Sequence, residues 1–525
     1  MRLYLGLDCS TQSLTAMAIA IDGARRDVVF EHSVEFDRDL PRYDTRHGVL
    51  PSADPLVAES PPLMWVEALD RLLGELAASS LDLTRLAAIA GSAQQHGSVY
   101  LNQTSDGRLA SLDPAQPLVD QLSGIFARPA APIWMDTSTS AECTEITAAI
   151  GGAARLAALT GSRAFERFTG PQIRRVAKRW PDAYAATSHI HLVSSFMATM
   201  LAGRQAPLDP GDASGMNLMD LQGRRWSRAA MDATASGLEP KLPPIVPATT
   251  VIGTLSPYWQ SRYRLPPAAL VVWTGDNPSS LAGTGIVDEG QVAVSLGTSD
   301  TIFGLMRSPH VDSSGTGHVF GSPTGDYMGL TCLRNGSLAR ERIRDAYGLD
   351  WSGFSRALET THPGQNGALM LPWFEPEITP SVTVPAVHRR HLDAGSAQMN
   401  VRALVEAQMM ALANHSRWMG IEIRTIHATG GAAANRAILR VMADVFGADV
   451  YQFQVSNAAC LGAALRAWHA DEAARGSPKT WSDIVAGLAE PVMASRIRPD
   501  AEAVRTYDAL RAEYARFETE ILSGR

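Results

Sequence analysis

Asp276 is the residue of this sequence best placed to act as a base. It follows the apolar run 269–273 and precedes Asn277-Pro278, a pair typical of a helix start. The pattern predicts a buried strand that ends where a helix begins, with Asn277 as the N-cap. The positive end of the helix favours an ionised carboxylate, which a base accepting a hydroxyl proton must be. The simpler alternative is that Asp276 only caps the helix.

Asp8 ends another apolar segment and is followed by small hydroxyl residues. Residues 3–7 have the alternating pattern of a strand, and Ser10 and Thr11 lie in the turn behind it. A carboxylate at such a strand end suits a hydrated Mg²⁺, and small residues admit a phosphate. The alternative is a turn aspartate that accepts hydrogen bonds from its own backbone.

The pattern around Asp8 recurs in the second half of the sequence. Residues 3–7 and 14–21 predict a hairpin, and residues 292–296 and 301–305 predict another, with Gly297-Thr298-Ser299 in its turn. The amides and hydroxyls of that turn could hold a second phosphate. The two hairpins indicate an internal duplication, unless they are two unrelated hairpins with polar turns.

Gly430 and Gly431 lie between a predicted strand, 425–428, and a predicted helix near 436–446. Glycines at such a turn let a ligand approach the backbone and leave the helix N-terminus open to it. Together with Asn435, the turn could close on adenosine. It could also be an ordinary entry into the helix.

Gln94-Gln95-His96 follows the apolar run 86–90 and combines amides with an imidazole. Such a cluster suits a neutral polyhydroxy ligand, which needs hydrogen-bond donors and acceptors rather than charge. A structural histidine is the alternative. Arg167, within the segment 166–170, would by composition alone be a solvated or paired arginine.

Composition limits the class of protein. Of 525 residues, 45% are hydrophobic and 19% charged, which excludes extensive disorder and allows two to four domains. The net charge of −8 gives no reason to expect a nucleic-acid or membrane partner. Four dispersed cysteines form no zinc or dithiol motif, and no signal peptide or membrane span is evident, so we expect a cytoplasmic protein. Only three of the 46 basic residues are lysines, and no Gly-Lys pair exists, which excludes a P-loop.

Several long segments resemble the FGGY family of carbohydrate kinases, and the resemblance runs from Leu5 to about His469. It is carried by segments distributed along the chain, among them 91–100, 134–136, 159–170, 214–218, 274–278, 294–300, 335–338 and 428–431. Their number and order make the resemblance specific.

The resemblance implies an α/β fold of two ribonuclease H-like domains, of the actin and sugar-kinase superfamily, with a cleft between them. We place the domains at residues 1–247 and 248–525, because the proline-rich segment 240–254 is the best candidate linker. The implied activity is ATP-dependent phosphorylation of D-xylulose at its 5-hydroxyl, with ATP and Mg²⁺ as cofactors. The only partner implied is a small ketose, with no nucleic acid or membrane, and the chain is expected as a monomer or homodimer.

The resemblance also assigns residues by position. The sugar would contact His96, Arg167, Asp276 and Asn277, with Asp276 as catalytic base. The nucleotide and its phosphates would contact Asp8, Ser10, Thr11, Thr298, Trp351, Gly430, Gly431 and Asn435. Asp8 would hold Mg²⁺ through water.

Other readings remain open at this point. The substrate could be another ketose, such as D-ribulose or L-xylulose, or a polyol. The chain could be a non-catalytic sugar or ATP sensor, or an actin-like ATPase that needs no sugar. Two departures from relatives bear on affinity: Thr15 replaces a lysine on the second strand of the first hairpin, and Ala93 stands where glycine is frequent.

Overall fold

The computed structural model describes residues 1–524 and divides the chain into two compact units. Unit 1 holds Met1–Gly285, Phe320–Tyr327 and Ser456–Ala489, and unit 2 holds Ile286–Val319, Met328–Val455 and the residues from Glu490 on. The division predicted after residue 247 falls inside unit 1. The reason lies in backbone hydrogen bonds, since the amides of Leu208 and Val246 donate to the carbonyls of Pro244 and Leu208. The segment 240–254 is thereby fastened within unit 1.

The sheet of unit 1 has the strand order β11-β12-β5-β1-β2-β3, and the short strand β13 also pairs with β5. Its strands are β1 (Arg2–Cys9), β2 (Ser13–Asp22), β3 (Arg25–Glu35), β5 (Leu86–Ala93), β11 (Val251–Thr254), β12 (Ala269–Val271) and β13 (Thr274–Gly275). Strand β1 pairs antiparallel with β2 and parallel with β5, which pairs parallel with β12.

The sheet of unit 2 has the strand order β16-β17-β15-β14-β20-β21. Its strands are β14 (Gln291–Leu296), β15 (Asp300–Met306), β16 (His318–Gly321), β17 (Tyr327–Leu333), β20 (Thr425–Thr429) and β21 (Asp449–Gln452). Strand β14 pairs antiparallel with β15 and parallel with β20, which pairs parallel with β21.

Both sheets therefore repeat one arrangement. The first hairpin strand, β1 or β14, is central, with its hairpin partner on one side and two parallel strands on the other. A shared strand order in two halves of one chain is the mark of a duplicated domain. The predicted duplication and the predicted pair of α/β domains are confirmed.

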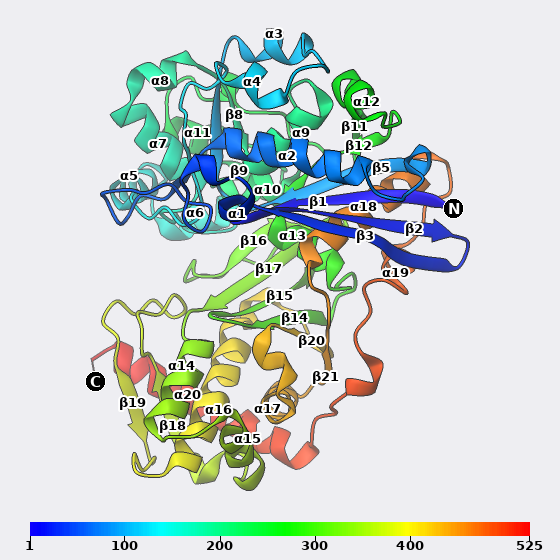
Figure 1. Cartoon of the computed structure of the whole chain (residues 1–525). Helices are drawn as coiled ribbons and strands as arrows, with labels where there is room; N and C mark the ends of the chain where they lie inside the picture. The colour runs from blue at the N-terminus through cyan, green and yellow to red at the C-terminus, as the bar shows by residue number, and fades with distance from the viewer. Residues whose placement is uncertain (525) are drawn as a thin grey trace. The chain divides into compact units, whose positions relative to one another are not determined.

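Helices cover both faces of the unit 1 sheet. Helix α18 (Ala458–Ala474) packs closely along β1, because a Cβ atom on Gly6 would lie 2.1 Å from the carbonyl oxygen of Cys460 (Figure 1). Side chains alternate along a strand, so Leu5 and Leu7 point to the opposite face. There they join a buried cluster with residues of α2 (Pro62–Ala77) and α9 (Val193–Ala202). Further helices of unit 1 are α5 (Ser140–Ile150), α6 (Ala153–Thr160), α7 (Thr169–Arg179), α8 (Pro181–Ala186), α11 (Arg228–Thr234), α12 (Pro257–Tyr263) and α13 (Asp276–Gly283).

Unit 2 is built around α16 (Ala397–His415), which is buried from Asn400 to Ala413. The other helices are α14 (Ser337–Ala346), α15 (Trp351–Thr360), α17 (Arg436–Phe446) and α20 (Ala501–Leu522), and α14, α15, α17 and α20 all contact α16. Within residues 1–524, no helix combines the length and apolar character needed to cross a membrane. The four cysteines are free thiols.

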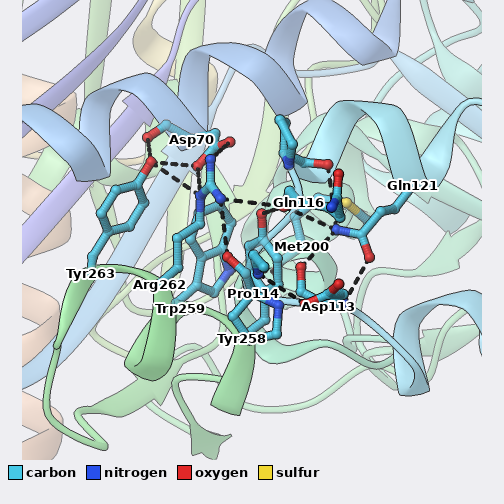
Figure 2. Close-up of polar contacts among 12 residues, drawn as sticks. Asp70, Asp113, Pro114, Gln116, Gln121, Met200, Tyr258, Trp259, Arg262 and Tyr263 are labelled. Atoms are coloured by element: carbon cyan, nitrogen blue, oxygen red, sulfur yellow. Dashed lines mark hydrogen bonds and ion pairs between the residues drawn. The ribbon is translucent and has the colours of Figure 1, made fainter.

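Figure 2 shows the polar contact that fastens α12 to α2 in unit 1. Asp70 of α2 accepts hydrogen bonds from Arg262 Nε at 2.8 Å and from the Tyr263 hydroxyl at 2.6 Å. Arg262 also donates to the carbonyls of Pro114 and Gln116, so one guanidinium holds α2, α12 and the 113–116 turn together. The pair is mostly buried, with side-chain exposures of 20% and 11%.

Replacing Asp70 with Asn should lower the free energy of unfolding by about 2–3 kcal/mol, because it leaves a mostly buried guanidinium without its counter-charge. Denaturant unfolding measures this. The control is Asp232→Asn, which breaks an exposed pair with Arg228 and should cost less than about 0.5 kcal/mol. Equal losses in the two variants would contradict the assigned role of Asp70.

Candidate functional site

The register of three parallel strands brings the two predicted carboxylates of unit 1 to one edge of the sheet. Asp8 of β1 is opposite Ser92 of β5, and Thr274 of β13 is opposite the same serine. The carboxyl ends of parallel strands lie together, so the chain leaves all three strands at the same place. Asp8 and Asp276 therefore become neighbours although 268 positions separate them in sequence.

Close packing and one buried arginine hold these strand ends. Gly91 of β5 lies against Trp273, and a Cβ atom on Gly91 would lie 2.0 Å from that indole ring. Arg466 of α18 is fully buried and donates to the carbonyls of Gly91, Val272 and Ala248. A single side chain thus ties the strand that leads to His96 to the strand that leads to Asp276.

Asp8 is half-buried and has few partners. Its Oδ1 accepts a hydrogen bond from the Ser92 hydroxyl at 2.6 Å. Burial raises the pKa of Asp8 to about 6, although the Ser92 hydrogen bond opposes the shift. Carboxylate oxygens are preferred Mg²⁺ ligands, and Mg²⁺ commonly keeps several waters, so a single carboxylate suits the predicted water-mediated contact. Within residues 1–524 there is no cluster of three or more acidic, histidine or cysteine side chains that could enclose a metal.

Asp276 is the first residue of α13, with Gly275 as the N-cap, so the predicted cap at Asn277 is displaced by two residues. Its Oδ1 accepts the backbone amide of Asn277 at 2.8 Å and the side-chain amide of Asn277 at 3.1 Å. Burial, followed by the charge of Asp8, raises the pKa of Asp276 to about 7. The helix N-terminus therefore does not hold the pKa of this carboxyl at its ordinary value. The amide hydrogen bonds lower the pKa, but burial and the neighbouring carboxylate outweigh them.

Gln95 connects Asp276 to a third buried carboxyl that the sequence did not single out. Its side-chain oxygen accepts from the Asn277 amide at 3.1 Å, and its nitrogen donates to the Gly211 carbonyl at 3.4 Å. Asp212 follows Gly211 and is fully buried, and its Oδ2 accepts from the Ser194 hydroxyl. Burial raises the pKa of Asp212 well above its usual range. The only sequence signal for this group was the Asp-rich turn at 209–212.

His96 is held in a fixed tautomer and an unusual backbone conformation. Its φ of 73° lies in the left-handed region, which is costly for a residue with a side chain and is frequent at binding sites. Its Nδ1 lies 2.8 Å from the Gly215 carbonyl oxygen, which can only accept, so Nδ1 carries the proton. Burial, helped by Arg167, lowers the pKa of His96 to about 3. The neutral ring thus keeps a lone pair on Nε2.

Arg167 lies close to His96 through an aromatic contact. The His96 ring stacks on the Phe168 ring with centroids 4.4 Å apart, and the Arg167 guanidinium lies 5.6 Å from the centroid of the Phe168 ring. The four predicted sugar contacts, His96, Arg167, Asp276 and Asn277, therefore all belong to unit 1, linked through Phe168 and Gln95.

In the first hairpin turn, the hydroxyl groups predicted to bind phosphate make hydrogen bonds within the protein. The Ser10 hydroxyl bonds the Ser13 carbonyl at 3.0 Å and accepts the Ser13 amide at 3.2 Å. The Thr11 hydroxyl accepts from the indole of Trp134 at 2.8 Å. Thr15, which stands in place of a lysine, is buried and shares a 2.8 Å hydrogen bond with Ser33.

Unit 2 contains a separate cavity of about 720 Å³ beside the second hairpin turn. Its wall includes four of the predicted nucleotide residues, Thr298, Trp351, Gly431 and Asn435. Trp351 is 44% exposed, an unusual setting for a tryptophan, and the Arg344 guanidinium lies 4.5 Å from its ring.

The turn between β20 and α17 forms another part of that wall. Gly430 has a φ of 82°, and a Cβ atom there would lie 2.6 Å from the Leu296 carbonyl, so only glycine fits. Asn435 caps α17 by accepting the amides of Ala437 and Ile438, and its side-chain nitrogen donates to Ser355 Oγ at 2.9 Å. The predicted helix near 436–446 is confirmed. The predicted nucleotide residues are thus divided between the units, with Asp8, Ser10 and Thr11 in unit 1 and the rest in unit 2.

Family models match both halves of the chain. Residues 129–283 match the N-terminal domain, and residues 292–470 the C-terminal domain, of the FGGY family of carbohydrate kinases. The chain is 44% identical to xylulose kinase of Rattus norvegicus, over 99% of this chain and 97% of the relative. It is 43% identical to xylulose kinase 2 of Arabidopsis thaliana, over 89% and 87% of the two chains.

Solved structures confirm the fold. A xyloylose kinase from Brucella ovis superposes with a TM-score of 0.83 at 21% identity and covers 100% of both chains. A gluconate kinase from Lactobacillus acidophilus superposes with a TM-score of 0.82 at 17% identity, over 99% of this chain and 98% of its own. Kinases named for different sugars share this fold, so the fold alone does not identify the substrate. With the family models and full-length relatives in agreement, the chain belongs to the FGGY family of carbohydrate kinases.

Proposed function

We propose that this enzyme transfers the γ-phosphoryl group of ATP to the 5-hydroxyl of D-xylulose. The observation that carries the proposal is the half-buried carboxyl of Asp276, whose pKa of about 7 suits a base that acts near neutral pH. The choice of D-xylulose is supported by relatives at 43–44% identity that are named xylulose kinases. No feature of the site favours a second sugar over it.

Asp276 acts as the general base. In its ionised form it accepts the proton of the sugar hydroxyl as that oxygen attacks the γ-phosphorus. The bond between this phosphorus and the bridging oxygen of ADP breaks, and ADP leaves. Asn277 holds the carboxylate by two hydrogen bonds, and Gln95 holds Asn277, so the base is oriented before the sugar arrives.

The sugar carries no charged group, so the direction of its hydrogen bonds to the protein decides how it is oriented. His96 accepts a hydrogen bond from a sugar hydroxyl on Nε2, because Nδ1–H is already donated to the Gly215 carbonyl. Arg167 can only donate, and the two amide hydrogens of Asn277 are already donated to Asp276 and Gln95, so Asn277 offers its Oδ1 as an acceptor. One donor and two acceptors around the base discriminate among hydroxyl arrangements, since a wrongly placed hydroxyl leaves a buried group unpaired.

The phosphates are held by turns rather than by lysine. Asp8 would hold Mg²⁺ through water, and the metal, when bound, neutralises charge on the phosphate oxygens during transfer. The first turn contributes the backbone amide of Thr11, since the Ser10 hydroxyl is engaged with Ser13 and the Thr11 hydroxyl with Trp134. Thr298 contributes from the second turn. Trp351, Gly430, Gly431 and Asn435 hold the nucleoside.

The proposed substrate can be tested by measuring ADP formation with D-xylulose, D-ribulose, L-xylulose, xylitol and no sugar. We expect kcat/KM for D-xylulose to exceed the others by at least about 10-fold, because misplaced hydroxyls leave site groups unpaired. A larger value for another sugar would overturn the substrate assignment. Equal ADP formation without sugar would indicate an ATPase, and no ADP with any sugar would indicate a binding protein.

Replacing Asp276 with Asn should lower kcat by about 10²–10⁴-fold, because the amide cannot accept the hydroxyl proton. The amide has nearly the same shape, so the KM for D-xylulose should change little. MgADP binding, measured by calorimetry, should be unchanged. Asp232→Asn, on the surface of α11, serves as the control with unaltered kcat. Near-normal turnover in the Asp276 variant would show that another group removes the proton.

A further inference from the structure

A buried ion pair that has no part in the proposed chemistry lies beneath the turn 297–299 of the second hairpin, in unit 2. Arg340 of α14 donates from Nη1 to Asp300 Oδ2 at 2.7 Å and from Nη2 to Asp300 Oδ1 at 2.9 Å. Both side chains are 1% exposed. Arg340 also belongs to the wall of the 720 Å³ cavity, although its guanidinium is closed off from solvent.

The ion pair is connected to the turn at both of its ends. Asp300 is the residue at which β15 begins, directly after the turn. The carbonyl of Gly297 accepts the amide of Ser337 at 2.8 Å and Arg340 Nη2 at 3.4 Å. The first carbonyl of the turn and the side chain that directly follows the turn are therefore both bonded to α14.

A second layer fixes the arginine. Gln408 of α16 accepts Arg340 Nη1 at 2.9 Å and donates to the carbonyls of Asn335 at 2.7 Å and Gly336 at 3.0 Å. Gly336 lies tightly against the turn, since a Cβ atom there would lie 2.7 Å from the carbonyl oxygens of Gly297 and Thr298. A substitution of Arg340 would therefore move the backbone of the turn, because the closely packed neighbours leave no space to accommodate the change elsewhere.

The upper side of the turn is left available. Within residues 1–524, the amides and hydroxyls of Thr298 and Ser299 donate no hydrogen bond to the protein. Unused backbone donors in a turn form a concavity that suits an anion. The turn is thus hydrogen-bonded to α14 on one side, while its donors on the other side are left without a partner in the described residues.

The buried pair is poorly explained as a stabilising contact. Taking two charges out of water offsets most of their attraction, so a buried pair is a weak source of stability. The Nε–H of Arg340 is also buried without an acceptor within residues 1–524, which adds a cost. What the pair supplies is geometry, because two parallel hydrogen bonds fix the relative position of the two groups.

We propose that the Arg340–Asp300 pair positions the turn 297–299 for the phosphates of the nucleotide. Arg340 and Asp300 are positioning residues that act through the backbone of Gly297, Thr298 and Ser299 and do not touch the nucleotide. This inference rests on the proposed function, which assigns the nucleotide to the unit 2 cavity. It adds that phosphate affinity depends on a bidentate contact and not on net charge, because the pair is neutral overall.

The test compares Arg340→Lys and Asp300→Asn with a matched control. Lysine keeps the positive charge but cannot form the two parallel hydrogen bonds, whereas asparagine keeps the shape of Asp300 and removes its charge. The control is Glu406→Gln, which breaks the buried pair of Glu406 with Arg402 in the same unit, where the exposures are 0% and 7%. Neither Glu406 nor Arg402 lies in the cavity wall.

We expect Arg340→Lys to weaken MgADP binding by about 10-fold in calorimetry and to raise the KM for ATP to a similar degree. The KM for D-xylulose should stay within about two-fold, because the sugar residues belong to unit 1. Glu406→Gln should lower the melting temperature while MgADP affinity stays within about two-fold. If Arg340→Lys fails to fold, Asp300→Asn is judged by the same thresholds.

The inference is overturned if the folded variants bind MgADP as tightly as the wild type. It is also overturned if Glu406→Gln weakens MgADP binding as much as they do, because the loss would then follow from destabilisation alone. A wild-type protein that binds no MgADP would instead contradict the proposed function and this inference with it.

Discussion

The placement of two carboxyl groups at one edge of the same sheet is the constraint on which the candidate site depends. Asp8 and Asp276 come to the same edge of the sheet, on either side of β5, because β1, β5 and β13 run parallel and end together. Burial, followed by the charge of Asp8, raises the pKa of Asp276 to about 7. Ser92, Asn277 and Gln95 then fix the two carboxyls by hydrogen bonds.

In the proposed function, the duplicated architecture would let two hairpin turns hold the phosphates in a chain with only three lysines. Each half supplies a hairpin turn, and the second turn is held from below by the Arg340–Asp300 pair. Lys178 and Lys241 are occupied elsewhere in unit 1, with Glu145 and with the carbonyl of Thr187. The buried Arg340 and Arg466 bond to backbone carbonyls within their units, and in the proposed function the backbone amides of the turns would bind the phosphates.

Local sequence patterns were sufficient for the hairpins, the strand before Asp276 and the helix after Asn435, because alternation, turn residues and caps act over a few positions. They also identified the His96 cluster. The patterns could not predict the raised pKa of Asp276, because it depends on burial and on Asp8 across the sheet. Nor could they predict that Ser10 bonds within its own turn or that unit 1 extends past residue 247. Asp212 and the Arg340–Asp300 pair were missed because their partners are distant in sequence.

The central claim is that Asp276 is a base whose pKa is set by burial and by Asp8. A carboxyl ¹³C NMR titration of the metal-free protein measures it directly, with the Asp276 signal identified by its absence from the Asp276→Asn variant. We predict a midpoint at about 7 that moves toward the ordinary 3.8 in Asp8→Asn, because the neighbouring negative charge is removed. A midpoint near 3.8 in the wild type, or one that Asp8→Asn leaves unchanged, would contradict the account.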